Sequence, residues 1–203
     1  DLVGKGMKIA PHTVFVGSTG VIGQTLSMSR IRQGMPALVK QLRRAGGHDA
    51  ARAILTTDLK AKEVAYSTRI GGKTITVGGM AKGSGMIHPD MATMLAYLTT
   101  DAAVEQSALQ HALTQAVNAS FNCITVDGDS STNDTVLCLA NGLAGNPVLR
   151  QGSAALATLQ GRHAWAAPRI QRLVNRTRIA SHPVHARQRC QTMPPSAARQ
   201  SES

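Results

Sequence analysis

Aromatic side chains are almost absent from this sequence. They make up 2% of the 203 residues, so a hydrophobic core has to be built from aliphatic side chains and methionine. Hydrophobic residues as a whole reach 42%, which is enough to bury a core in a chain of this length. No apolar run approaches the roughly 20 residues that a membrane-spanning helix needs. We therefore expect an α/β protein rich in small residues, with no membrane partner.

Cysteine is also scarce. The three cysteines, Cys123, Cys138 and Cys190, show no Cys-x-x-Cys spacing. An odd count without a secretory leader is typical of a reducing compartment, so a cytoplasmic location is expected. Apolar neighbours surround Cys123 and Cys138, and we expect both to be free thiols of the core.

Acidic residues are missing above all from the C-terminal part. Residues 1–150 hold 14 Lys and Arg against 10 Asp and Glu, whereas residues 151–203 hold 8 Arg against a single Glu. Most of the net charge of +11 therefore belongs to the tail, which we expect to be disordered. The tail lacks the interleaved aromatic side chains of single-strand binders, so no nucleic-acid partner is expected. Residues 1–150 are the predicted folded domain.

Three ligand-binding motifs are incomplete. The glycines at 17, 20 and 23 do not follow the Gly-x-Gly-x-x-Gly pattern of dinucleotide-binding folds. A phosphate-binding loop ending at the Gly-Gly-Lys-Thr string would need glycine where Ser67 stands. The acidic run that begins at 127 has Thr132 where a calcium-binding EF-hand loop requires glycine. We predict no cofactor and no metal site.

The stretch 80–101 carries the most specific pattern of the chain. A glycine-rich loop with Lys82 leads to Ala92 and Thr93, and an apolar run at 94–98 follows. A threonine hydroxyl needs a base beside it, and its own α-amine can serve once the chain is cut in front of it. Such a cut needs a small preceding residue, a permissive turn and a stiff element behind. We predict cleavage between Ala92 and Thr93 with Thr93 as nucleophile, and the alternative is a polar loop that runs into a buried strand.

Together with the Phe-Asn pair at 121–122 and the run 124–142, this stretch resembles the ornithine acetyltransferase family, the glutamate N-acetyltransferases of arginine biosynthesis. The strings Lys-Gly-Ser-Gly-Met-Ile-His-Pro and Met-Ala-Thr-Met-Leu are its specific parts. The resemblance covers about 14–146 and leaves out the tail, which we therefore expect to be unrelated to the family. It implies a layered α/β sandwich of the self-cleaving type, here incomplete at both ends.

The resemblance also implies an activity. Family members move acetyl from N2-acetylornithine to glutamate by a ping-pong route, and bifunctional members also take acetyl from acetyl-CoA as a co-substrate. Their cleaved α and β chains assemble into a hetero-oligomer. The alternative is an inactive fragment or pseudoenzyme that lacks the C-terminal substrate-binding residues.

Four further positions receive roles from the family pattern. Thr19, through its hydroxyl, and Gly20, through its backbone N–H, match the oxyanion hole; without the family they read as a tight turn. Thr56, with Thr57 as the next choice, and Lys82 match positions that contact substrate, as Thr93 does. The alternatives are threonines that cap or end elements, and a solvated loop lysine.

Hydrophobic periodicity and turn residues predict the remaining elements. A Gly-Gly turn at 71–72 indicates a tight hairpin. The expected strands are 13–16, 63–66, 74–77, 123–126 and 135–140, and the expected helices are 28–33, 36–45, 50–54 and 105–120.

Overall fold

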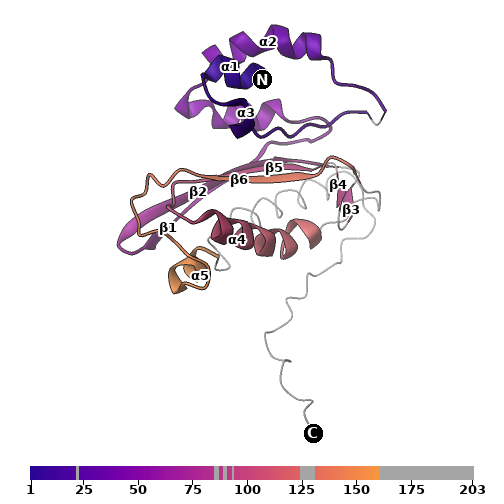
Figure 1. The fold of residues 1–203 in the computed structure, drawn as a ribbon. Helices are drawn as coiled ribbons and strands as arrows, with labels where there is room; N and C mark the ends of the chain where they lie inside the picture. The colour runs from indigo at the N-terminus through magenta and orange to yellow at the C-terminus, as the bar shows by residue number, and fades with distance from the viewer. Residues whose placement is uncertain (22, 85–86, 89–90, 93, 124–130, 161–203) are drawn as a thin grey trace.

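The computed structural model describes residues 1–21, 23–84, 87–88, 91–92, 94–123 and 131–160. Its centre is a four-stranded sheet in the order β1-β2-β5-β6, with helices on both sides, so the predicted α/β class is confirmed (Figure 1). β1, β2 and β5 are antiparallel, and β6 runs parallel to β5. The strands are β1 Lys62–Ile70, β2 Lys73–Lys82, β5 Leu95–Thr100 and β6 Thr135–Ala140, with β3 Ile87–His88 and β4 Met91–Ala92 as a separate pair.

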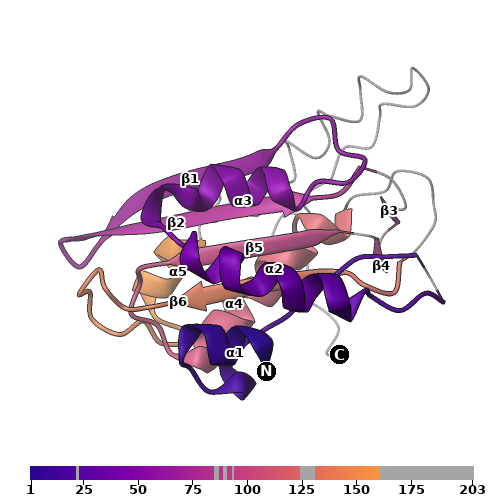
Figure 2. The ribbon, with the colours of Figure 1, turned by 90° about the horizontal axis from the view of Figure 1, so that it is seen from above.

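Helices form one layer on each face of the sheet. α1, α2 and α3 lie on one side, as the view onto that layer shows (Figure 2), and α4 and α5 lie on the other. In the described part of the chain, no helix combines the length and the apolar character needed to cross a bilayer. The helices are α1 Leu2–Met7, α2 Met28–Lys40, α3 Gly47–Ala53, α4 Gln106–Asn118 and α5 Ala154–Gln160, with 3-10 turns η1 Pro11–Thr13, η2 Arg44–Gly46 and η3 Phe121–Cys123.

The β1–β2 hairpin confirms the prediction made from two glycines. Gly71 and Gly72 have φ values of 57° and 78°, and Ile70 pairs with Lys73 across the turn. Two consecutive positive φ angles are what a two-residue turn with the right twist requires, and glycine adopts them without strain.

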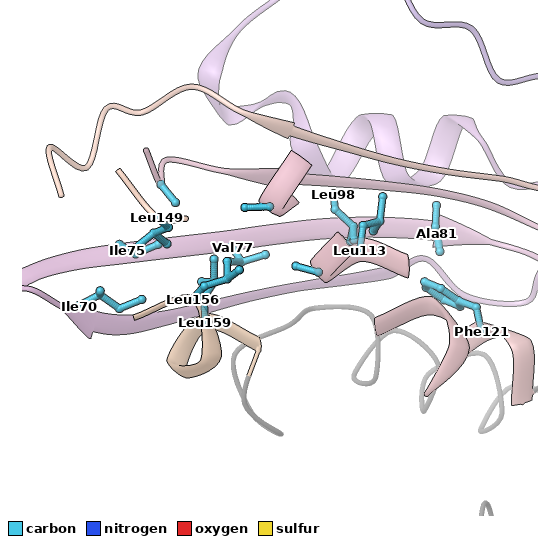
Figure 3. Packing of buried hydrophobic residues seen from close by; sticks show 14 of the residues in the cluster. Ile70, Ile75, Val77, Ala81, Leu98, Leu113, Phe121, Leu149, Leu156 and Leu159 are labelled. Atoms are coloured by element: carbon cyan, nitrogen blue, oxygen red, sulfur yellow. The ribbon is translucent and has the colours of Figure 1, made fainter. Parts of the chain in front are cut away.

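The hydrophobic core lies between the sheet and the α4–α5 layer. Strand alternation points Ile75 and Val77 of β2 and Leu98 of β5 to this face, where helical spacing brings Ala112 and Leu113 of α4 against them. Figure 3 shows the cluster. The core is aliphatic, as the composition predicts, with one aromatic member. Its buried members are Ile70, Ile75, Val77, Ala81, Met94, Ala96, Leu98, Ala102, Ala108, Ala112, Leu113, Phe121, Leu149, Leu156 and Leu159.

The crossover from β5 to β6 explains why α4 covers this face. Parallel neighbours cannot be joined by a tight turn, so the chain has to return across the sheet. α4 makes that return and carries the predicted apolar stripe. The prediction of a helix at 105–120 is confirmed within two residues at each end.

Two predicted elements near the N-terminus are wrong. Residues 13–16 form no strand, and Phe15 and Val16 are 65% and 76% exposed. A short apolar run becomes a strand only beside another strand, and this segment lies in the layer of α1–α3. The two predicted helices around Pro36 are one helix, α2, with the proline inside it. The strand expected at 123–126 starts in η3 and otherwise lies outside the described residues.

The predicted domain boundary at residue 150 is too early. α5 follows it, and Leu156 and Leu159 are buried in the core. The two leucines are three residues apart, so they share one helix face, which packs against α4 and β1. Residues 161–203, the rest of the predicted tail, lie outside the described residues.

Candidate active site

Lys82 is the last residue of β2 and is 3% exposed. Its ammonium Nζ donates a hydrogen bond to Thr56 Oγ1 at 3.0 Å. The structure thus brings together two of the positions predicted to contact substrate. Lys82 pairs with Leu95 of β5, so it projects from the face opposite the core residue Ala81. The alternative of a solvated loop lysine is wrong, because the side chain is buried.

The electrostatic surroundings of Lys82 are mixed. Burial lowers the pKa of Lys82 below its ordinary value. The negative charge of Asp58 opposes this effect, the positive charge of Lys62 adds to it, and the negative charge of Asp134 also opposes it. Among the described residues, the Thr56 hydroxyl is the hydrogen-bond partner of the ammonium. A buried cation held by a neutral hydroxyl favours an anionic ligand such as a carboxylate.

The loop before β1 lies along the end of β2. Thr57 Oγ1 and Ser84 Oγ are 2.7 Å apart, next to the contact between Thr56 and Lys82. Neither threonine caps a described helix, since α3 ends at Ala53 with Ile54 as its C-cap. The alternative of a capping role is therefore not supported, and both hydroxyls face the Lys82 loop.

A buried ion pair fastens this loop. Asp58 Oδ1 accepts hydrogen bonds from Lys62 Nζ and, at 2.8 Å, from the backbone N–H of Gly83. Burial raises the pKa of Asp58, but these hydrogen bonds and the charge of Lys62 outweigh it and leave the pKa below its ordinary value. Removing one partner of such a pair typically costs about 3–5 kcal/mol, because the other charge stays buried. Sequence reasoning missed this pair; its one signal was the i, i+4 spacing of Asp58 and Lys62.

Asp134 connects the start of β6 to the start of β5. Its Oδ1 accepts the backbone N–H of Met94 at 2.8 Å, and the N–H of Thr135 donates to the Met94 carbonyl at 3.0 Å. Burial raises the pKa of Asp134 to about 6, although the Met94 N–H and the charge of Lys82 pull it down. The sequence drew attention to this acidic run only as an incomplete calcium-binding loop. Residues 124–130 of that loop lie outside the described residues.

The glycine-rich turn of the predicted oxyanion hole approaches β5. Tyr97 Oη donates a hydrogen bond to the Gly17 carbonyl oxygen at 3.4 Å. A Cβ atom added at Gly17 would lie 2.6 Å from Tyr97 Oη. Thr19 is half-buried and Gly20 is exposed. Tyr97 is two residues from Leu95 in β5, so this turn lies on the sheet face from which Lys82 projects. Within the described part of the chain, no hydrogen bond joins Thr19 or Gly20 to Lys82.

The predicted nucleophile Thr93 lies outside the described residues. Before it, the backbone of Ala92 belongs to β4 and pairs with Ile87 of β3, at the end of the sheet (Figure 1). After it, Met94 is buried and leads into β5. The stiff element expected behind the predicted cleavage site is therefore confirmed as a strand.

Comparisons with known proteins give a consistent result. Residues 1–168 match the ArgJ family, and this range passes the predicted boundary at residue 150. The chain is 57% identical over 153 residues to the arginine biosynthesis bifunctional protein ArgJ of Symbiobacterium thermophilum, covering 75% of this chain and 38% of that protein. It is 55% identical over 143 residues to the protein of the same name from Bacillus subtilis, covering 70% and 35%.

A crystal structure of the arginine biosynthesis bifunctional protein argJ from Bacillus halodurans is 39% identical to the chain, with a TM-score of 0.37. The aligned region covers 39% of this chain and 38% of the crystallised chain. The chain thus spans less than two fifths of the length of the relatives described here.

Proposed function

The chain belongs to the ArgJ family, and from this premise we propose that it carries part of the active site of an acetyltransferase of arginine biosynthesis. The reaction is transfer of acetyl from N2-acetylornithine to glutamate. The nucleophile is Thr93, freed by cleavage of the bond that follows Ala92.

The first step of the proposal is self-cleavage. Thr93 Oγ attacks the carbonyl carbon of Ala92, a C–O bond forms, the C–N bond breaks, and the hydroxyl proton ends on the Thr93 nitrogen. Water then hydrolyses the ester, which yields a carboxylate at Ala92 and restores the hydroxyl. The new α-amine is the base that an isolated threonine hydroxyl lacks.

The second step is acetyl transfer. Thr93 Oγ attacks the acetyl carbon of N2-acetylornithine, and its proton passes through the α-amine to the departing ornithine nitrogen. The glutamate amine then attacks the acetyl ester, the C–O bond breaks, and a proton returns to Oγ. Thr19 and Gly20 are proposed to donate to the oxyanion, where one such donor is typically worth about 3 kcal/mol.

The observation that carries the proposal is the buried ammonium of Lys82. Both substrates bear an α-carboxylate, and a desolvated cation that already contacts the hydroxyl of Thr56 is suited to bind it. The chain that follows Lys82 reaches the proposed cleavage site through β3 and β4.

The remaining properties of the proposal follow from the family. We place the protein in the cytoplasm, with its two cleaved chains held in a hetero-oligomer. Its partners are the small-molecule substrates and not nucleic acid. No bound cofactor is needed, because acetyl-CoA would act only as an alternative acetyl donor.

Intact-mass measurement of the purified chain tests the cleavage. Two pieces that separate between Ala92 and Thr93 are expected, with a single uncut piece for Thr93→Ala. Acetyl exchange between N2-acetylornithine and glutamate tests the transfer. Lys82→Met, which keeps the length of the side chain without its charge, should raise KM for both substrates. An unchanged KM would remove Lys82 from substrate binding.

A second candidate is an inactive fragment or pseudoenzyme of the family. The chain spans 38% of the length of the Symbiobacterium thermophilum protein, so the activity of this part alone has to be measured. A wild-type chain that stays uncut and exchanges no acetyl would establish this candidate.

A further inference from the structure

We propose that Asp134 is a positioning residue for self-cleavage, acting through its hydrogen bond to the backbone N–H of Met94, the residue that follows Thr93. The inference rests on the proposed function. It assigns a role to a side chain that the predicted site did not include.

The geometry identifies which group Asp134 holds. The N–H of Met94 belongs to the same planar peptide unit as the carbonyl group of Thr93. A hydrogen bond of 2.8 Å to Asp134 Oδ1 therefore orients the peptide that joins the nucleophile to β5. The Met94 carbonyl is held in turn by the N–H of Thr135 at 3.0 Å, so both polar groups of Met94 are bound to the start of β6.

A carboxylate at this position has a cost that an amide would avoid. An asparagine oxygen could accept the same N–H, and it would not carry a charge that burial disfavours. The pKa of Asp134 is raised to about 6 by burial, with the Met94 N–H and the charge of Lys82 opposing. Lys82, from β2, is the charged group that acts on Asp134 among the described residues, and Asp58 and Lys62 act on Lys82. An ionised carboxylate accepts a stronger hydrogen bond than a neutral acid, so the hold on Met94 should tighten as pH rises through about 6.

The experiment follows cleavage of the full chain from the moment of its synthesis. Each variant is made in a cell-free translation reaction and shifted to buffers between pH 5 and 7.5, and the ratio of cut to uncut chain is measured by intact mass over time. Wild type is expected to show a cleavage rate that rises with a midpoint near pH 6.

Two variants separate the hydrogen bond from the charge. Asp134→Ala loses the acceptor and should cleave about 10- to 100-fold more slowly, the size expected for a misplaced reacting group. Asp134→Asn keeps an acceptor without the charge, so its rate should lose the midpoint near pH 6. In thermal unfolding, Asp134→Asn should be at least as stable as wild type. A changed pH profile of cleavage in this variant would then not be due to loss of structure.

The chain offers a matched control at the far end of β5. Asp101 Oδ1 accepts the backbone N–H of Thr76 at 2.7 Å, a contact of the same kind. Asp101→Asn should cleave with the rate and pH profile of wild type. If Asp101→Asn changes the pH profile of cleavage in the same way as Asp134→Asn, the inference is overturned. The change would then follow from replacing any aspartate of the sheet that accepts a backbone N–H.

The outcomes distinguish this inference from the proposed function. An uncut wild-type chain would overturn both. The inference alone would be overturned by three results together. The wild-type chain is cut, Asp134→Asn keeps the wild-type pH profile of cleavage, and Asp134→Ala keeps the wild-type cleavage rate. If Asp134→Ala does not fold, the pH profile of Asp134→Asn decides.

Discussion

The two faces of the sheet differ in what they contribute. On the face toward α4 and α5, Ile75, Val77 and Leu98 are almost completely buried. On the face toward α1–α3, Ser67, Thr76 and Thr99 are polar and partly or fully exposed, and Ser67 Oγ lies 3.1 Å from Thr76 Oγ1. Among the described residues of α2, none is buried. One face therefore stabilises the fold, and the other leaves room for polar groups.

The candidate site lies on the second of these faces. Lys82 projects from it, and the turn at Gly17 packs on it through Tyr97. A charged group can be retained there because the free energy of folding comes from the apolar layer on the other side. The apolar core and the candidate site thus lie on opposite faces, and single substitutions can test this division.

The largest effect is expected on the core face. Leu98→Ala removes a side chain that is 1% exposed and should lower the free energy of unfolding by about 2–5 kcal/mol, because it leaves a cavity. Its sequence neighbour Thr99 points to the other face, and Thr99→Ala should change stability by about 0.5 kcal/mol or less. Urea unfolding of both variants measures the difference. Equal losses would mean that the two faces contribute alike.

Gly17→Ala tests the closest contact of the second face. The added Cβ would lie 2.6 Å from Tyr97 Oη, a distance that real Cβ atoms do not show, so the segment or the ring has to move. We expect a loss of about 1–3 kcal/mol. Tyr97→Phe removes the nearest atom and should recover most of the loss in the double variant. Gly20→Ala, whose Cβ would have its nearest neighbour at 3.6 Å, is the control and should be nearly neutral.

Asp134→Asn should stabilise the protein at neutral pH. The pKa of Asp134 is about 6 in the folded protein against an ordinary 3.8, so the folded state binds the proton more tightly than the unfolded chain does. Stability is then greatest below about pH 4, falls between pH 4 and 6, and stays lower above pH 6. After allowance for solvent screening, the asparagine variant should be about 1 kcal/mol more stable at pH 7.

Urea unfolding at pH 4, 5, 6 and 7 measures this difference. A gap between the two proteins that does not grow with pH would show that the carboxyl group is not destabilised by burial. The test is independent of cleavage when it is done in the uncleavable Thr93→Ala background.

The smallest effect is expected on α2. Leu38 is 60% exposed, and Leu38→Ala should change the free energy of unfolding by about 0.5 kcal/mol or less. Leu113→Ala on α4, the matched change in the buried helix, should cost about 2–5 kcal/mol. A Leu38→Ala variant as unstable as Leu113→Ala would show that a partner outside the described residues covers α2.

Local signals were sufficient for part of the fold. Two glycines defined the β1–β2 hairpin, the apolar stripe defined α4, and alternation defined β6 at 135–140. These elements depend on neighbours in sequence. The run at 13–16 was wrongly predicted to be a strand, and α5 was missed because its residues were expected to be disordered. What decides both is whether a distant strand or helix lies beside them.

The site shows the same limit. The family pattern paired Thr56 with Lys82 as substrate contacts, and their side chains meet at 3.0 Å. Lys82 is buried, and Asp134 contacts Met94, only because of the order of the strands, which the sequence does not state. The pairing of Asp58 with Lys62 is local, with an i, i+4 spacing, and it was missed although the sequence carried that signal.

The parallel pairing of β5 with β6 also has a consequence for the order of folding. The β1–β2 hairpin is local, whereas β6 joins β5 only after the 34 residues between Thr100 and Thr135 have been looped back. We therefore expect Asp134 to reach the Met94 amide in a late step, after α4 has docked. We expect the nascent chain to remain intact until its sheet is complete, and pulsed hydrogen exchange should find the Met94 amide among the last to become protected.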